Sequence, residues 1–323
     1  MSMTRRTLLA AGLGLAAAGR AAGGGGGGEG TAGIATRPIP RTGERIPVVG
    51  LGTWRTFDVG ASDADRAPLL EVLRRFLSGG GRVIDSSPMY GEAERVVGDL
   101  LARLPESPRP FLATKVWTRG RAQGEAEMAE SMRRLRVAPS PAPLRGAEEV
   151  RGQARLDLMQ VHNLLDWREH LPTMRAWKAA GRIRYVGITH YAASAFAELE
   201  SILRTEGVDF VQLPYSAARR EAEARLLPAA AETGTAVLVM RPFEEGELFR
   251  MVKGRPLPSW AGELGAASWS EVFLRFILSH PAVTAVIPAT SKVAHLEENL
   301  RAGRGTPDVD PALRRRMERD LRF

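Results

Sequence analysis

Short apolar runs alternate along the chain with longer stretches in which apolar residues recur every three or four positions. The apolar runs have the length of buried strands and occupy residues 48–52, 83–85, 111–115, 156–161, 185–188, 210–213, 236–240 and 283–287. The stretches between them have helical spacing and occupy residues 67–77, 92–104, 125–135, 171–180, 193–206, 221–232 and 269–279. Because a helix follows each strand, the pattern predicts an α/β fold, a parallel (β/α)8 barrel.

A short hairpin is expected before the first barrel strand. Residues 37–47 contain two short stretches with β-branched residues, separated by Thr42-Gly43, which is typical of a tight turn. A chain of 323 residues with 44% hydrophobic content can bury one large core. We therefore expect one barrel domain over residues 37–323, and two smaller domains are the weaker alternative.

Residues 1–28 are expected to be a targeting signal and not part of the folded domain. Arg5 and Arg6 precede Thr7-Leu8-Leu9, and the Ala/Leu/Gly stretch that follows is too short and too small to span a bilayer. The segment resembles an export signal of the twin-arginine type, followed by a flexible glycine run. We expect the twin-arginine export machinery as a partner and a periplasmic location. The alternative is a disordered basic tail on a cytoplasmic protein.

Composition narrows the classes of function. The 45 Lys and Arg exceed the 37 Asp and Glu, giving a net charge of +8, but the basic residues are scattered and form no basic stretch interleaved with aromatics, so nucleic-acid binding is not expected. The chain has no cysteine, and its five histidines lack the spacing of metal ligands, so no metal centre is expected. Without a heptad repeat or a large apolar surface helix, we expect a monomer.

Polar residues stand at the ends of the predicted strands. Any single one is explained equally well by solvent exposure at a rim, but the set recurs from strand to strand. Active sites of such barrels lie at the carboxyl ends of the strands. The candidates are Asp85, Lys115, His162, Thr189, Gln212 and Thr290.

Six separated motifs carry a resemblance to a known family. They are V-V-G-L-G-T-W ending at Trp54, V-I-D-S-S-P-M-Y-G ending at Gly91, A-T-K-V-W ending at Trp117, D-L-M-Q-V-H-N ending at Asn163, G-R-I-R-Y-V-G-I-T-H-Y ending at Tyr191, and I-P-A-T-S-K ending at Lys292 with a later E-E-N. In this order and at strand ends, they resemble the aldo-keto reductases, which are TIM barrels that reduce aldehydes or ketones with NAD(P)H.

The resemblance implies a catalytic tetrad. Tyr90 would be the general acid that protonates the carbonyl oxygen while the nicotinamide delivers hydride to carbon. Lys115 would lower the pKa of the phenol, and Asp85 would pair with that lysine. His162 would hydrogen-bond the substrate oxygen and orient it, together with its neighbour Asn163.

The resemblance also implies the ligand sites. The nicotinamide half of the cofactor would lie against Thr53, Asp85, Thr189, His190, Gln212, Met240 and Arg241. The adenosine half would lie against Thr290, Ser291, Lys292, His295, Glu298 and Asn299, with a phosphate near the helix that opens at Val293. The substrate pocket would be walled by Trp54, Tyr90, Trp117, His162 and Asn163, which favours an apolar or aromatic carbonyl compound.

Several positions depart from the family pattern. Ala289 and His295 stand where many NADP-preferring relatives have basic residues, although Lys292 still favours NADP(H) over NAD(H). Met240 replaces an aromatic that stacks on the nicotinamide, and Glu244-Glu245 could narrow the cofactor channel or repel phosphate. The longest departure is residues 137–155, expected to be a mobile excursion on the face away from the chemistry, with an interaction surface as the alternative.

Two functions are compatible with these residues, and a third is disfavoured. The first is an exported oxidoreductase that reduces aldehydes or ketones. The second, suggested by the departures in the cofactor site, is a nicotinamide-binding redox sensor or partner subunit with little turnover. A barrel isomerase or aldolase using Lys115 as a Schiff base is disfavoured, because an Asp85 partner would keep the lysine charged.

Overall fold

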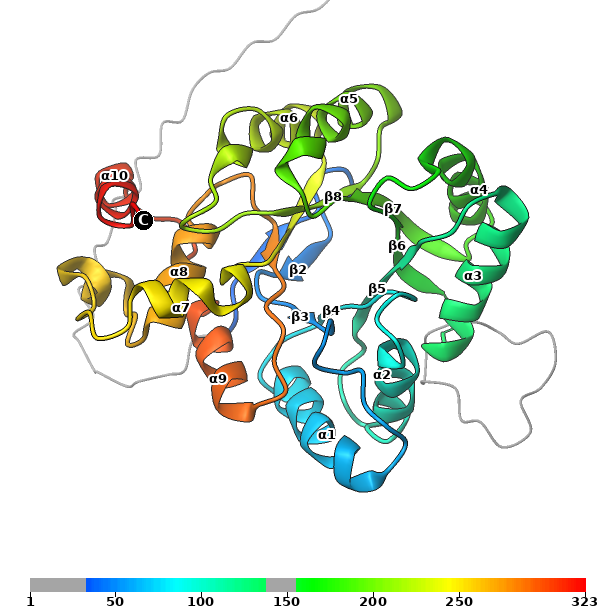
Figure 1. Ribbon diagram of the computed structural model, residues 1–323, viewed down its shortest axis with the longest axis horizontal. Helices are drawn as coiled ribbons and strands as arrows, with labels where there is room; N and C mark the ends of the chain where they lie inside the picture. Colours follow the sequence, from blue (N-terminus) through cyan, green and yellow to red (C-terminus); the bar gives the residue numbers. More distant parts are fainter. Residues whose placement is uncertain (1–32, 138–154) are drawn as a thin grey trace, which may run out of the picture. The chain divides into compact units, whose positions relative to one another are not determined.

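The computed structural model describes residues 33–137 and 155–323, which form a (β/α)8 barrel (Figure 1). Within this part of the chain, eight parallel strands are hydrogen-bonded in sequence order. They are β3 (Leu51–Gly52), β4 (Val83–Asp85), β5 (Phe111–Val116), β6 (Leu156–His162), β7 (Ile183–Thr189), β8 (Phe210–Pro214), β9 (Ala236–Met240) and β10 (Ala285–Val286). Parallel bridges from Val49 to Val286 and from Gly52 to Ala289 close the barrel, so the predicted fold is confirmed.

Helices surround the strands, as Figure 1 shows. Those that follow the pattern of apolar residues are α1 (Asp63–Ser78), α2 (Ala93–Ala102), α3 (Arg121–Arg134), α4 (Trp167–Ala179), α5 (Phe196–Glu206), α6 (Leu226–Thr233), α8 (Trp269–Leu278) and α9 (Val293–Ala302). Side-chain caps begin two of them, because Ser62 accepts a hydrogen bond from the backbone N–H of Asp65 and Ser268 from that of Glu271.

The sequence pattern did not predict six shorter or more polar elements. They are α7 (Glu247–Met251), α10 (Pro311–Asp320) and the 3₁₀ turns η1 (Ala193–Ala195), η2 (Glu221–Glu223), η3 (Glu244–Gly246) and η4 (Ser259–Leu264). Two of these turns lie inside predicted helices, which therefore start later than expected. At the closing seam, β3 and β10 are shorter than the apolar runs that predicted them, because only part of each run pairs with a neighbour.

The predicted hairpin plugs one end of the barrel. Strands β1 (Thr36–Pro38) and β2 (Arg45–Pro47) pair antiparallel, and Gly43 in the turn has a φ of 73°. Ile39 and Ile46 are buried in the same apolar cluster as residues that begin strands, such as Phe111 and Phe210. Because the hairpin closes the amino ends of the strands, the open mouth of the barrel is at their carboxyl ends.

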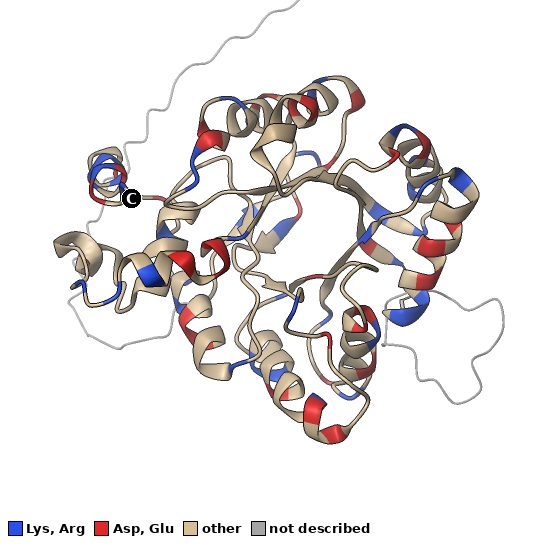
Figure 2. Cartoon of the chain, in the orientation of Figure 1, with Lys and Arg blue, Asp and Glu red and all other residues tan. Residues whose placement is uncertain are grey.

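Charged residues of both signs are interspersed along the helices around the barrel (Figure 2). Many form ion pairs within one helix, as between Glu71 and Arg75 on α1. Within residues 33–137 and 155–323, no helix is long and apolar enough to cross a membrane. The expected export segment at residues 1–28 lies outside the described residues, as does the excursion expected after α3, apart from its end residues Val137 and Arg155.

Candidate active site

A buried ion pair lies at the carboxyl ends of β4 and β5. The Lys115 Nζ donates hydrogen bonds of 2.7 Å to Asp85 Oδ2 and of 2.7 Å to the Ser86 carbonyl. Two amides, from Gln160 and Gln212, donate to Asp85 Oδ1 at 3.1 and 2.9 Å. Burial alone would lower the pKa of Lys115, but the negative charge of Asp85 and the contact with Tyr90 outweigh it and raise that pKa. The lysine therefore stays charged although it is 0% exposed.

Tyr90 lies in the loop after β4 and meets this ion pair. The Lys115 Nζ is 5.1 Å from the centroid of the Tyr90 ring, and the His162 ring stands nearly perpendicular to it at 6.0 Å. Burial raises the pKa of the Tyr90 phenol, and the nearby charge of Lys115 offsets this only in part. Lys115 thus acts on Tyr90 in the expected direction, but the loss of hydration is the larger effect and the pKa of the phenol in the free protein is raised.

His162 ends β6 and is held through one ring nitrogen. The Ser87 hydroxyl lies 3.0 Å from His162 Nδ1, and the backbone N–H of Met89 donates to the same hydroxyl oxygen at 3.4 Å. The Ser87 hydroxyl can donate its hydrogen to Nδ1, and in that arrangement the neutral ring carries its proton on Nε2. Burial, together with the charge of Lys115, lowers the pKa of His162 to about 2, so the ring is neutral.

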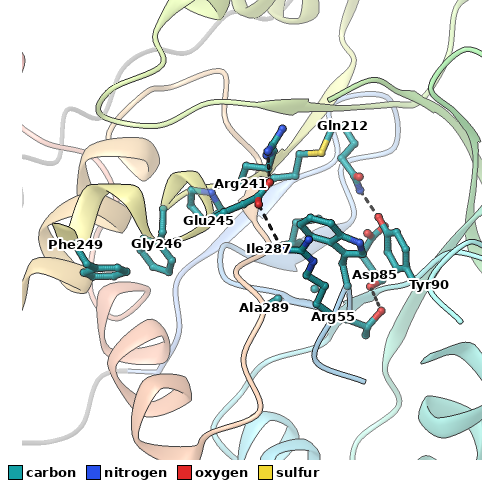
Figure 3. A pocket seen from close by; sticks show the side chains of 16 residues that line it. Arg55, Asp85, Tyr90, Gln212, Arg241, Glu245, Gly246, Phe249, Ile287 and Ala289 are labelled. Carbon is teal, nitrogen blue, oxygen red and sulfur yellow. Dashed lines mark hydrogen bonds and ion pairs between the residues drawn. The ribbon is translucent and has the colours of Figure 1, made fainter. Parts of the chain in front are cut away.

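Two adjoining cavities open at this end of the barrel. The first, of about 310 Å³, is drawn in Figure 3 and is lined by Gly52, Thr53, Trp54, Arg55, Asp85, Tyr90, Gln212, Met240, Arg241, Pro242, Phe243, Glu245, Gly246, Phe249, Ile287 and Ala289. The second, of about 420 Å³, is lined by Trp54, Met89, Tyr90, Trp117, His162, Asn163, Tyr191, Met240, Arg241 and Glu245. Five residues line both cavities, and Tyr90 is one of them, with Trp54, Met240, Arg241 and Glu245.

These cavities bring together all the residues predicted for the substrate pocket and part of the predicted cofactor site. The second cavity contains Trp54, Tyr90, Trp117, His162 and Asn163. Thr53, Asp85, Gln212, Met240 and Arg241 line the first cavity.

Thr189 ends β7 and His190 follows it, and neither residue lines the two cavities. The Thr189 hydroxyl donates to Gln212 Oε1 at 3.3 Å, so Thr189 positions an amide that lines the first cavity. The His190 ring stacks on Tyr191 at 5.3 Å, and its Nδ1 accepts from the backbone N–H of Ala192.

The residues predicted for the adenosine half lie apart from the lining of both cavities, around the start of α9. The Thr290 hydroxyl accepts from the backbone N–H of Lys292 at 3.1 Å and so holds the loop before the helix. Ser291, Lys292 and His295 are exposed. Asn299 is buried and accepts a hydrogen bond from Ser270 on α8, and Glu298 accepts a long one of 3.5 Å from Ser268, so both contact a neighbouring helix.

Sequence reasoning missed three residues that shape the site, Gln160, Ser87 and Arg55, and noted Glu245 without identifying its partner. Gln160 holds Asp85, and a fully buried amide inside an apolar strand was a signal for such a role. Ser87 positions His162, and its polar character just after a strand end pointed the same way. Arg55 and Glu245 face each other across the first cavity. Nothing in the local sequence pairs these last two residues, because they belong to loops far apart in the chain.

Comparisons with known proteins identify the family of the chain. A sequence profile described as the aldo/keto reductase family matches residues 48–308. The chain is similar to the aldo-keto reductase YhdN of Bacillus subtilis, with 26% identity over 216 residues, 62% of this chain and 60% of that protein. It is 28% identical over 254 residues to pyridoxine 4-dehydrogenase of Escherichia coli, which is 74% of this chain and 82% of that protein.

A solved structure extends the comparison to the fold. The aldo/keto reductase from Klebsiella pneumoniae in complex with NADP and acetate has a TM-score of 0.69 at 24% identity, covering 86% of this chain and 93% of that chain. Fold and site together define a (β/α)8-barrel enzyme with a lysine–aspartate pair beside a tyrosine at the barrel mouth. The chain belongs to the aldo/keto reductase family, which is consistent with NAD(P)-dependent carbonyl reduction.

Proposed function

We propose that the protein reduces aldehydes or ketones to alcohols with NAD(P)H and that Tyr90 donates the proton. The observation that carries this proposal is the position of the protonated Tyr90 phenol on the wall shared by the two cavities, beside the charged Lys115. One cavity would hold the nicotinamide end of the cofactor and the other the substrate carbonyl. The phenol would then meet the carbonyl oxygen at the boundary between them.

Arg241 in the first cavity and Lys292 near α9 fit the negative charge of a dinucleotide. Arg241 Nε is buried and has no hydrogen-bond partner among the described residues, which suits an anionic ligand. The exposed Lys292 near the start of α9 adds a second positive charge and favours NADP(H) over NAD(H), in keeping with the NADP in the Klebsiella structure. When bound, the nicotinamide supplies the hydride.

The residues of the chain would supply orientation and the proton. His162 would donate through Nε2 to the carbonyl oxygen and orient it. The proton would then pass from the Tyr90 hydroxyl to that oxygen as the carbon receives the hydride. Lys115 would stabilise the phenolate left behind, while Asp85 keeps the lysine in position.

The second cavity favours an apolar or aromatic carbonyl compound. Trp54 and Trp117 are 37% and 41% exposed, and Met89 and Tyr191 also line the cavity with large exposed surfaces. Exposed aromatic and thioether side chains around a catalytic cavity provide an apolar surface for a ligand.

The experiment that tests the proposal measures NADPH and NADH oxidation with a panel of aromatic aldehydes and diketones. Tyr90→Phe removes only the hydroxyl, and we expect kcat to fall by about 100-fold or more while the dissociation constant for the cofactor stays unchanged. Tyr185→Phe is the matched control, because its hydroxyl bonds Glu44 and Thr42 of the hairpin region at the other end of the barrel.

Two outcomes would contradict the proposal. Equal turnover in wild type and Tyr90→Phe would remove the tyrosine from the mechanism. Cofactor binding without turnover of any carbonyl compound would favour the redox sensor or partner subunit, a role suggested by Glu245 lying in the first cavity.

We further propose that residues 1–28 direct export to the periplasm through the twin-arginine route. The proposal is supported by Arg5-Arg6 and the small apolar stretch after them. Fusing residues 1–28 to a reporter enzyme tests it, with both arginines replaced by lysine in the comparison fusion. Export that is unchanged in the lysine version would contradict the route.

A further inference from the structure

Two ion pairs that share Glu245 connect two loops that line the first cavity. The Glu245 Oε1 pairs with Arg241 Nη2, and its Oε2 lies 3.6 Å from Arg55 Nη1 (Figure 3). Arg55 belongs to the loop after β3 and Arg241 follows β9, while β10 lies between these two strands in the barrel. The Glu245 side chain therefore links the loop after β3 to the loop after β9, past the carboxyl end of β10.

The two arginines carry more positive charge than Glu245 neutralises. Arg241 Nε is buried without a hydrogen-bond partner among the described residues, and the exposed Arg55 guanidinium also lies over the Trp54 ring, 4.4 Å from its centroid. Two guanidinium groups that face the same space are well suited to the oxygens of a phosphate or carboxylate group. In the free protein, the two oxygens of Glu245 occupy that place.

Glu245 lies in a tight turn, and its side chain is partly exposed. Glu244 and Glu245 have φ values of 48° and 56°, a left-handed conformation that L-residues seldom adopt, and Gly246 follows with a φ of 94°. The Glu245 side chain is also 38% exposed, so water can accept the carboxylate when it leaves the arginines. The segment thus presents a carboxylate to the cavity without burying it there.

We propose that Arg55 and Arg241 form an oxyanion-binding subsite and that Glu245 is its resident anion, displaced when a ligand binds. The inference rests on the proposed function and adds to it a class of ligand group. That group is either a phosphate of the dinucleotide or an acidic group on the carbonyl substrate. Each ligand must replace the carboxylate of Glu245, so the glutamate weakens binding of the group that the arginines attract.

The test compares the full-length wild type with Glu245→Gln, which keeps the shape of the side chain and removes its charge. Glu247→Gln is the matched control, because Glu247 lies two residues further on and pairs with the exposed Arg250 outside both cavities. Binding of inorganic pyrophosphate and of NADPH is measured by calorimetry. In parallel, KM is measured for benzaldehyde and 4-carboxybenzaldehyde. Thermal unfolding verifies that each variant is folded.

We expect Glu245→Gln to bind its oxyanion about three- to tenfold more tightly than wild type, and Glu247→Gln to match wild type. Tighter binding of pyrophosphate and NADPH identifies the phosphates as the group that is bound. A lower KM for 4-carboxybenzaldehyde alone identifies an acid on the substrate. Arg55→Gln in the Glu245→Gln background should abolish the gain in either case.

The inference would be overturned if Glu245→Gln bound both phosphate ligands no more tightly than wild type and had no lower KM for 4-carboxybenzaldehyde. Turnover by the wild type would in that case leave the proposed function intact. Conversely, tighter pyrophosphate binding in a protein that reduces no carbonyl compound would support the subsite and contradict the proposed function. The two hypotheses are thus tested separately.

Discussion

At the residue scale, burial and charge set the protonation states of Lys115, Tyr90 and His162, opposing each other in the first two and acting together in the third. Lys115 keeps its charge because Asp85 and Tyr90 outweigh the penalty of burial. Tyr90 keeps its proton because burial raises the pKa of the phenol more than Lys115 lowers it. His162 stays neutral for both reasons, since burial and Lys115 act in the same direction. The protonation states needed for a proton donor and a neutral orienting imidazole are therefore set before any ligand binds.

These states predict the pH dependence of carbonyl reduction. The pKa of His162 is lowered to about 2, so the ring stays neutral at every pH above that value, and the pKa of Tyr90 is raised from 10.0, so its proton is lost only in strong base. We expect kcat/KM for reduction to stay flat between about pH 5 and about pH 9. A pH series with a neutral aldehyde measures this. An acid limb with an apparent pKa near 6.5 would show that His162 titrates as an exposed histidine does.

At the element scale, α10 explains why one part of the fold could not be predicted. Its sequence is strongly basic, and only Met317 within it is buried, so it lacks the apolar stripe that predicts a helix. Arg314 replaces that stripe with polar contacts. Its guanidinium pairs with Glu223 at 2.7 Å, donates to the Tyr215 hydroxyl at 2.7 Å and to the Phe276 carbonyl at 2.7 Å. Such a network depends on the Glu223 side chain in η2, the Tyr215 side chain just after β8 and a backbone carbonyl of α8, which local periodicity cannot reveal.

Arg314 and Arg316, two residues apart on α10, provide a matched test. The Arg314 side chain is 12% exposed, and Arg314→Ala would leave the carboxylate of Glu223 with fewer partners, which should lower the free energy of unfolding by about 3 kcal/mol. The Arg316 side chain is 39% exposed and pairs with Glu263 in solvent, so Arg316→Ala should cost below about 1 kcal/mol. Urea unfolding of both variants measures the difference. Equal losses would mean that the buried network does not hold the helix.

At the scale of the whole molecule, the seam between β3 and β10 completes the barrel. The backbone N–H of Gly50 donates to the Val286 carbonyl at 2.8 Å, and that of Gly52 donates to the Pro288 carbonyl at 3.0 Å. The chain approaches its neighbours closely here. A Cβ placed on Gly50 would lie 2.9 Å from the Val83 carbonyl oxygen and 2.9 Å from Ile287 Cγ2. Glycine at this position lets the first and last strands of the barrel meet.

Gly50→Ala should therefore overpack the barrel interior and lower the free energy of unfolding by roughly 1–3 kcal/mol. Gly262→Ala is the control, because a Cβ at Gly262 would have no atom within 4 Å and the residue has no left-handed backbone. Thermal unfolding of the two variants compares them. If Gly50→Ala were as stable as the control, the strands around Gly50 could accommodate the added methyl group without loss of stability.

The sequence by itself determined the eightfold alternation of strands and helices, the hairpin, and the polar residues at strand ends, of which Asp85, Lys115 and His162 lie together in the structure. These follow from local order, because parallel strands that share one barrel bring their carboxyl ends to one mouth. The tertiary structure alone decided which side chains meet there. Ser87 holds His162 from 75 residues away, and Gln212 reaches Asp85 across 127 residues. The bridge from Arg55 through Glu245 to Arg241 likewise depends on the closed barrel, because no pattern along the chain records which loops become neighbours when the first strand meets the last.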